Sequence, residues 1–212
     1  MAIVEGHLSI RHFDEEKLVS ALQELSVNFR VAFAAACAER QLPTYRVFHE
    51  RTGKGNPLVL RDALDRIWDD LGGRPLAPEE IKTAIDQCLA YMPGETDGGF
   101  SQHHAHAEDA AASVAYALRT RLTGEAQEAA WCARRAYESL DSHVVNELDV
   151  DPGEPGAEDR IVRHSAIQRE LSRQDRDLAD LLTLVDHAGE ARSAIETLRT
   201  RAHEEAASFL EP

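Results

Sequence analysis

Imidazoles and carboxylates are concentrated between residues 102 and 109, which makes this segment the part of the chain best suited to chemistry. It reads Gln-His-His-Ala-His-Ala-Glu-Asp. On a helix, His103 and His106 lie three residues apart, as do His106 and Asp109, so the members of each pair share a face. Neutral imidazole is a good ligand for Zn²⁺ and Ni²⁺. The spacing therefore raises a metal site as one hypothesis, with zinc or nickel as the ion.

A helical hairpin would bring further ligands to this cluster. We expect helices over residues 102–122 and 125–148, joined at Thr123-Gly124, and in an antiparallel hairpin His104 lies level with His143. His143 and Glu147 are four residues apart and share a helix face. One alternative function is thus a metal-binding protein or metal-dependent hydrolase. Its candidate ligands are His103, His104, His106, Asp109, His143 and Glu147.

The pattern around these histidines also favours a purely structural interpretation. We expect His106 and Asp109 to point away from the apolar stripe of their helix, so the ligands do not converge. The sequence contains neither H-E-x-x-H nor a paired E-x-x-H motif. Polar residues are also tolerated at the solvated open end of a hairpin. We therefore predict no catalytic residue and no cofactor, with the metal site kept as the alternative.

A second group of charged residues lies between residues 37 and 71. The segment follows the pattern Glu-Arg-x-x-Pro-x-Tyr-x-x-Phe-x-x-x-Thr-Gly-x-Gly, then Arg-x-x-Leu-Asp-x-Ile-Trp. This spacing resembles the YjaG-like bacterial proteins, the domain-of-unknown-function 416 family. The resemblance extends from about Phe29 to about Leu184 and includes residues 164–174. It implies an all-helical fold without an assigned activity and a genomic association with histidine-kinase signalling.

Four members of this pattern, which we call the signature charges, are not explained by helix starts, turns or core packing. Either they form a partly buried ion-pair network that fixes the packing of the first three helices, or they line a polar cleft. Pairing is favoured because no nucleophile or metal-ligand set accompanies them. The signature charges are Glu39, Arg40, Arg61 and Asp65.

Apolar spacing predicts helices along almost the whole chain, and no alternating run requires a strand. We expect a helix or helix pair from Asp14 to about Gln41, a stop at Pro43, and one long helix after residue 159. The predicted fold is all-α, a bundle of about seven helices around a central alanine-rich hairpin. Residues 13–212 are expected to form a single domain, preceded by a flexible arm at residues 1–12.

The charge balance bears on the class of partner. Lys and Arg number 23 against 38 Asp and Glu, a net charge of -15. So acidic a surface repels nucleic-acid phosphates and anionic membranes, and we expect neither as a partner. The first residues show no leader pattern, no apolar run is long enough to span a membrane, and the three cysteines form no C-x-x-C pair. These features predict a cytoplasmic bacterial protein.

The sequence as a whole favours a non-catalytic regulatory or protein-interaction module whose partner is another protein. An acidic surface suits a basic partner, so an immunity-type protein that masks a basic toxin is a further alternative. A homodimer is compatible with the sequence, although no motif indicates one.

Overall fold

The computed structural model describes residues 10–94, 101–184 and 189–211, and within these ranges it contains nine helices and no strand. The all-α prediction is confirmed, and the predicted helix number is slightly low. In chain order the helices are α1 (Glu15–Gln23), α2 (Val27–Thr52), α3 (Pro57–Leu71), α4 (Pro78–Ala90), α5 (Gln102–Thr123), α6 (Ala126–Glu147), α7 (Ala157–Val162), α8 (Ser165–Leu182) and α9 (Ala191–Ala206).

The predicted break at Pro43 is wrong, because α2 continues through this proline. Helix α1 instead ends at Gln23, and Ser26 caps α2 by accepting a hydrogen bond from the Phe29 amide at 3.3 Å. Proline removes one helix hydrogen bond and usually kinks or ends a helix. Here Tyr45 and Phe48 are buried on the far side of Pro43, so core packing holds the helix together across it.

The predicted long helix after residue 159 is also two helices. Helix α7 ends at Val162, and His164 caps α8 by accepting a hydrogen bond from the Ala166 amide at 3.3 Å. Histidine is an uncommon N-cap residue, which is why apolar spacing alone did not reveal this boundary.

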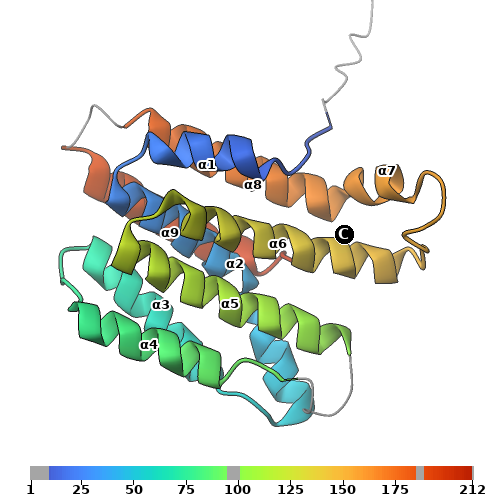
Figure 1. Cartoon of the computed structure of the whole chain (residues 1–212), viewed down its shortest axis with the longest axis horizontal. Coiled ribbons are helices and arrows are strands. Elements are labelled where there is room, and N and C mark those ends of the chain that lie inside the picture. The colour runs from blue at the N-terminus through green and yellow to red at the C-terminus, as the bar shows by residue number, and fades with distance from the viewer. Residues whose placement is uncertain (1–9, 95–100, 185–188, 212) are drawn as a thin grey trace, which may run out of the picture.

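The core is built on α2 and on the antiparallel hairpin of α5 and α6, which confirms the predicted alanine-rich hairpin (Figure 1). Buried alanines on these helices let their axes approach closely. Helices α3 and α4 cover α5 on one side, α1 and α8 cover α6 on the other, and α9 lies against α2. The buried alanines include Ala32, Ala35, Ala36, Ala110, Ala111, Ala129 and Ala133.

Most of the predicted N-terminal arm lies outside the described residues. Of its last three residues, Arg11 is tied to α8: its amide donates to the Gln168 side chain at 2.9 Å, and the Gln168 amide donates back to the Arg11 carbonyl at 2.9 Å. In the part of the chain that is described, no helix is both long and apolar enough to cross a membrane.

The turn after α2 is held by the Tyr45 hydroxyl. This hydroxyl donates to the Tyr91 carbonyl at 2.6 Å and accepts from the Asn56 amide at 3.2 Å, so it joins α2 to the start of α3 and to the end of α4. Gly55 has φ +71° and lies against the Tyr45 ring, where a Cβ would overlap the hydroxyl. Both the backbone angle and the close approach therefore require glycine at this position.

Three Gly→Ala substitutions separate these two requirements. Gly53→Ala should cost about 1–2 kcal/mol, because Gly53 has φ +68° but open space around it. Gly55→Ala should cost a further 1–3 kcal/mol or so, because Tyr45 must also move. Gly189→Ala meets open space without a positive φ and is the matched control. Urea unfolding measures the three values, and equal losses for Gly53→Ala and Gly55→Ala would contradict the role of Tyr45.

Candidate functional site

Arg40 of α2 is fully buried and bound by two carboxylates from α8. Its Nε and Nη2 atoms donate to the two oxygens of Glu170, each at 2.9 Å, and its Nη1 donates to Asp177 Oδ2 at 2.8 Å. Burial alone would lower the pKa of Arg40, but Glu170, Cys37 and Asp177 raise it well above its usual value. The guanidinium is thus charged and held in a fork geometry by the facing helix.

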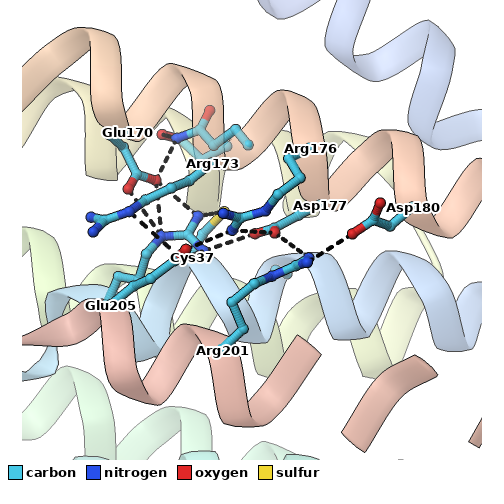
Figure 2. A network of polar contacts seen from close by, with 12 residues as sticks. Cys37, Glu170, Arg173, Arg176, Asp177, Asp180, Arg201 and Glu205 are labelled. Carbon is cyan, nitrogen blue, oxygen red and sulfur yellow. Dashed lines mark hydrogen bonds and ion pairs between the residues drawn. The ribbon is translucent and has the colours of Figure 1, made fainter. Parts of the chain in front are cut away.

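A second layer of ion pairs extends this contact to α9. Asp177 Oδ1 accepts hydrogen bonds from Arg176 at 3.0 Å and from Arg201 of α9 at 2.7 Å. Arg201 also binds Asp180 at 2.8 Å, and Arg176 binds Glu205 of α9 at 2.7 Å. Figure 2 shows these side chains converging between the two helices. We call this set of residues, with Arg40 and Glu170, the Arg40 network.

The Arg40 network is a structural contact that joins α2 to α8 and α9. It is not a binding site, because the Arg40 guanidinium is fully buried and fully hydrogen-bonded and offers no atom to a ligand. The sequence grouped Arg40 with the other signature charges and expected contacts among the first three helices. The structure corrects this, since Arg40 contacts α8 and α9 instead. The physical reason is that adjacent residues on a helix point about 100° apart, so Glu39 and Arg40 face different neighbours.

Glu39, at the neighbouring position of α2, is buried between α3 and α9. Its carboxylate accepts hydrogen bonds from Arg61 at 2.5 Å, from the Trp68 indole at 3.2 Å and from His203 of α9 at 3.0 Å. Burial alone would raise the pKa of Glu39, but hydrogen bonds from Arg61, His203 and Trp68 outweigh it and lower the pKa. Arg61 also binds Asp65 at 2.8 Å, so three of the four signature charges lie together.

Glu39 lies between two adjoining hollows, which together we call the α3–α9 groove. The first, which we call the polar hollow, has a volume of about 460 Å³ and is lined by charged and polar residues, with Arg61 and Asp65 of α3 facing residues of α9. The second, of about 270 Å³, is mainly apolar and extends over the C-terminal half of α2 to Leu58. Glu39, Arg61 and His203 line both hollows.

The histidine segment is more deeply buried than its sequence suggests. His106 is 1% exposed and its Nδ1 is 2.8 Å from the Ser139 hydroxyl, while Asp109 is 8% exposed and accepts from Arg135 at 3.2 Å. The expectation that both residues point away from the apolar stripe is therefore wrong. Helix α5 is covered by α2, α4 and α6, so little of its surface at this depth faces solvent.

The remaining candidate ligands have separate partners. His104 Nδ1 is 2.7 Å from the Ser101 hydroxyl, His143 Nδ1 is 3.1 Å from the Gln102 amide, and His143 Nε2 is 3.4 Å from Glu147. His103 is half-buried. Within residues 10–94, 101–184 and 189–211, no three His, Cys, Asp or Glu side chains are grouped as metal ligands. The described part of the chain thus supplies no group of three ligands for the zinc or nickel hypothesis.

Burial shifts two pKa values in this segment in opposite senses. It lowers the pKa of His106 to about 4, with smaller contributions from His143 and His103. It raises the pKa of Asp109 to about 7, because the nearby Arg135 offsets only part of the effect. In each case burial favours the uncharged form more than water does.

Sequence reasoning missed the partners of the signature charges. Glu170 and Asp177 are seven residues apart on the same face of α8 as Ile167 and Leu171, and carboxylates inside an apolar stripe indicate buried ion pairs. This indication of buried ion pairs is visible in the sequence. No sequence signal distinguishes His203 from the other isolated histidines, because its pairing with Glu39 depends on how α9 packs.

Comparisons with known proteins agree on one family. The family model described as "Protein of unknown function (DUF416)" matches residues 17–210. The uncharacterized protein YjaG of Escherichia coli (strain K12) is 29% identical over 108 residues, which is 50% of this chain and 54% of that protein. The crystal structure of a DUF416 family protein from Shewanella baltica OS155 superposes with a TM-score of 0.74 at 21% identity, covering 88% of this chain and 93% of that one.

Arg40→Met tests how much the Arg40 network stabilises the fold. The substitution keeps most of the side-chain volume but leaves Glu170 and Asp177 buried without Arg40, so we expect a loss of about 3–5 kcal/mol in the free energy of unfolding. Arg46→Met is the matched control on the same helix, because Arg46 is exposed and lies 3.7 Å from Glu50. It should change stability by less than about 0.5 kcal/mol. Similar losses in chemical denaturation would rule out a special role for Arg40.

His106→Gln tests the buried imidazole through pH. Because the folded pKa of about 4 lies below the ordinary value of 6.5, the unfolded chain takes up the proton first. The resulting stability is complete above pH 6.5 or so and falls by up to about 1.4 kcal/mol per pH unit as the pH drops toward 4. The difference in unfolding free energy between wild type and His106→Gln should follow this course. Parallel curves for wild type and His106→Gln would show that the buried imidazole does not cause the pH dependence.

Proposed function

This chain belongs to the DUF416 family of proteins of unknown function, and we propose that it is a non-catalytic regulatory module that binds another protein through the α3–α9 groove. A role in signalling is consistent with this proposal. Three of the four signature charges, Glu39, Arg61 and Asp65, line this groove.

One observation carries the proposal: a large apolar side chain that lines the groove is exposed to solvent. Leu58 is 76% exposed, the highest value among the exposed large hydrophobic residues of the described chain. It lines the apolar hollow together with Leu42, Pro43 and Pro57. Burying a leucine side chain stabilises by about 1.5–3 kcal/mol, so a partner that covered Leu58 would gain this energy.

The state of the candidate nucleophiles and charges supports binding rather than catalysis. The charged groups at the floor of the groove are paired, and the pKa of Glu39 is lowered while that of Arg61 is raised. Burial raises the pKa of the Cys88 and Cys132 thiols to about 12, which leaves almost no thiolate at neutral pH. We also propose a cytoplasmic location, because free, buried cysteines suit a reducing compartment.

Replacing Leu58 tests this proposal. Tagged wild type, Leu58→Gln and Leu89→Gln are used to recover proteins from cells of the source organism, and recovery is quantified by mass spectrometry. Leu89 is 51% exposed and lies outside the groove, which makes it a matched control. We expect a protein that wild type and Leu89→Gln recover equally, and that Leu58→Gln recovers at least about tenfold less.

The proposal would be contradicted by a set of recovered proteins that is the same for all three forms. Circular dichroism and urea unfolding of the variants serve as the check on folding. Leu58 lies in the first turn of α3 and its side chain is exposed, so Leu58→Gln should unfold within about 0.5 kcal/mol of wild type.

A further inference from the structure

The α9 wall of the α3–α9 groove carries carboxylates with no internal cation. Glu196, Thr200 and Glu204 are spaced four residues apart, so they form one stripe along the helix, and all three line the polar hollow. Glu196 and Glu204 are exposed, and neither has an ion pair within the described residues. Their charges therefore face the open groove.

The cations that line the polar hollow are already engaged. Arg61 binds both Glu39 and Asp65, and Arg199 lies 3.5 Å from Asp65. The lining holds four carboxylates and two guanidinium groups, an excess of two negative charges with histidine neutral. The excess resides on the α9 stripe, because Glu39 is fully bonded at the floor.

The apolar hollow adjoins this acidic wall directly, since Glu39, Arg61 and His203 border both hollows. A ligand that fills the whole groove must therefore place an apolar group against Leu58 and a cationic group near Glu196 and Glu204. A free metal ion or small amine satisfies only the second requirement, and a nucleic acid opposes it. A polypeptide segment satisfies both.

We propose that the α3–α9 groove binds a partner segment that carries an arginine or lysine close to a bulky apolar residue. The apolar side chain covers Leu58, and the cation lies between the α9 stripe and Asp65. This inference rests on the proposed function, because it names the chemistry of the partner at that same groove. Charge complementarity sets the choice of partner, while burial of the apolar residue supplies most of the affinity.

A selection from a phage-displayed library of random dodecapeptides on the full chain tests the partner chemistry. We expect enriched peptides to carry Arg or Lys within four positions of Leu, Ile, Met or Phe. Synthetic copies of these peptides, followed by fluorescence anisotropy, should lose most binding to Leu58→Gln. Enrichment of acidic peptides, of peptides without a cation, or of no sequence at all would overturn the inference.

A pair of double variants with the same net charge isolates the α9 stripe. Glu196→Gln/Glu204→Gln should weaken the selected peptide by about threefold to twentyfold, the range expected for two exposed ion pairs. Glu24→Gln/Glu108→Gln removes two exposed carboxylates outside the groove and should leave binding unchanged. Equal weakening by both double variants would show a general charge effect and overturn the proposal.

The two proposals fail in different ways. If Leu58→Gln loses a cellular protein but the selected peptides lack a cation, the groove binds a partner of another chemistry and only this inference falls. If basic, apolar peptides bind as expected but Leu58→Gln recovers the same cellular proteins as wild type, the proposed function falls while the groove chemistry stands.

Discussion

The position of the C-terminal helices depends on one buried charge, the guanidinium of Arg40. A charge removed from water is costly unless its partners are well placed. Glu170 and Asp177 meet this requirement from positions about two turns apart on α8, so α8 has one register on α2 in which both carboxylates reach Arg40. Asp177 then binds Arg201 and fixes α9 beside α8. The small alanine side chains let the helices approach closely, and the ion pairs determine how the helices are aligned.

The groove is a consequence of this alignment. Glu39 lies next to Arg40 in sequence but points about 100° away from it around α2, where it binds Arg61 and Trp68 of α3 and His203 of α9. Two adjacent residues therefore bind different neighbours of one helix, and the space left between α3 and α9 becomes a groove whose lining is set by the surrounding helices. Rigid support of this kind suits a recognition surface, because little ordering is needed on binding.

Local rules predicted the helices, and long-range packing decided what those rules left open. Asp14 and Asn56 begin helices as their side chains predict, because capping involves only neighbouring residues. The predicted break at Pro43 is wrong because core contacts distant in sequence offset the lost helix hydrogen bond. The grouping of Glu39, Arg61 and Asp65 followed from the family pattern, whereas the direction of Arg40 and the burial of His106 depend on which helices cover each face. Leu58 gives no signal in sequence, since exposure is a property of the assembled surface.

The most direct test of this account is a double-mutant cycle between Arg40 and Glu170, measured by chemical denaturation of wild type, Arg40→Met, Glu170→Gln and the double variant. We expect strong coupling: once one partner is lost, removing the second costs little, so the double variant should be more stable than additivity predicts by at least about 2 kcal/mol. Losses that add to within about 0.5 kcal/mol would contradict it, because Arg40 and Glu170 would then stabilise the fold independently.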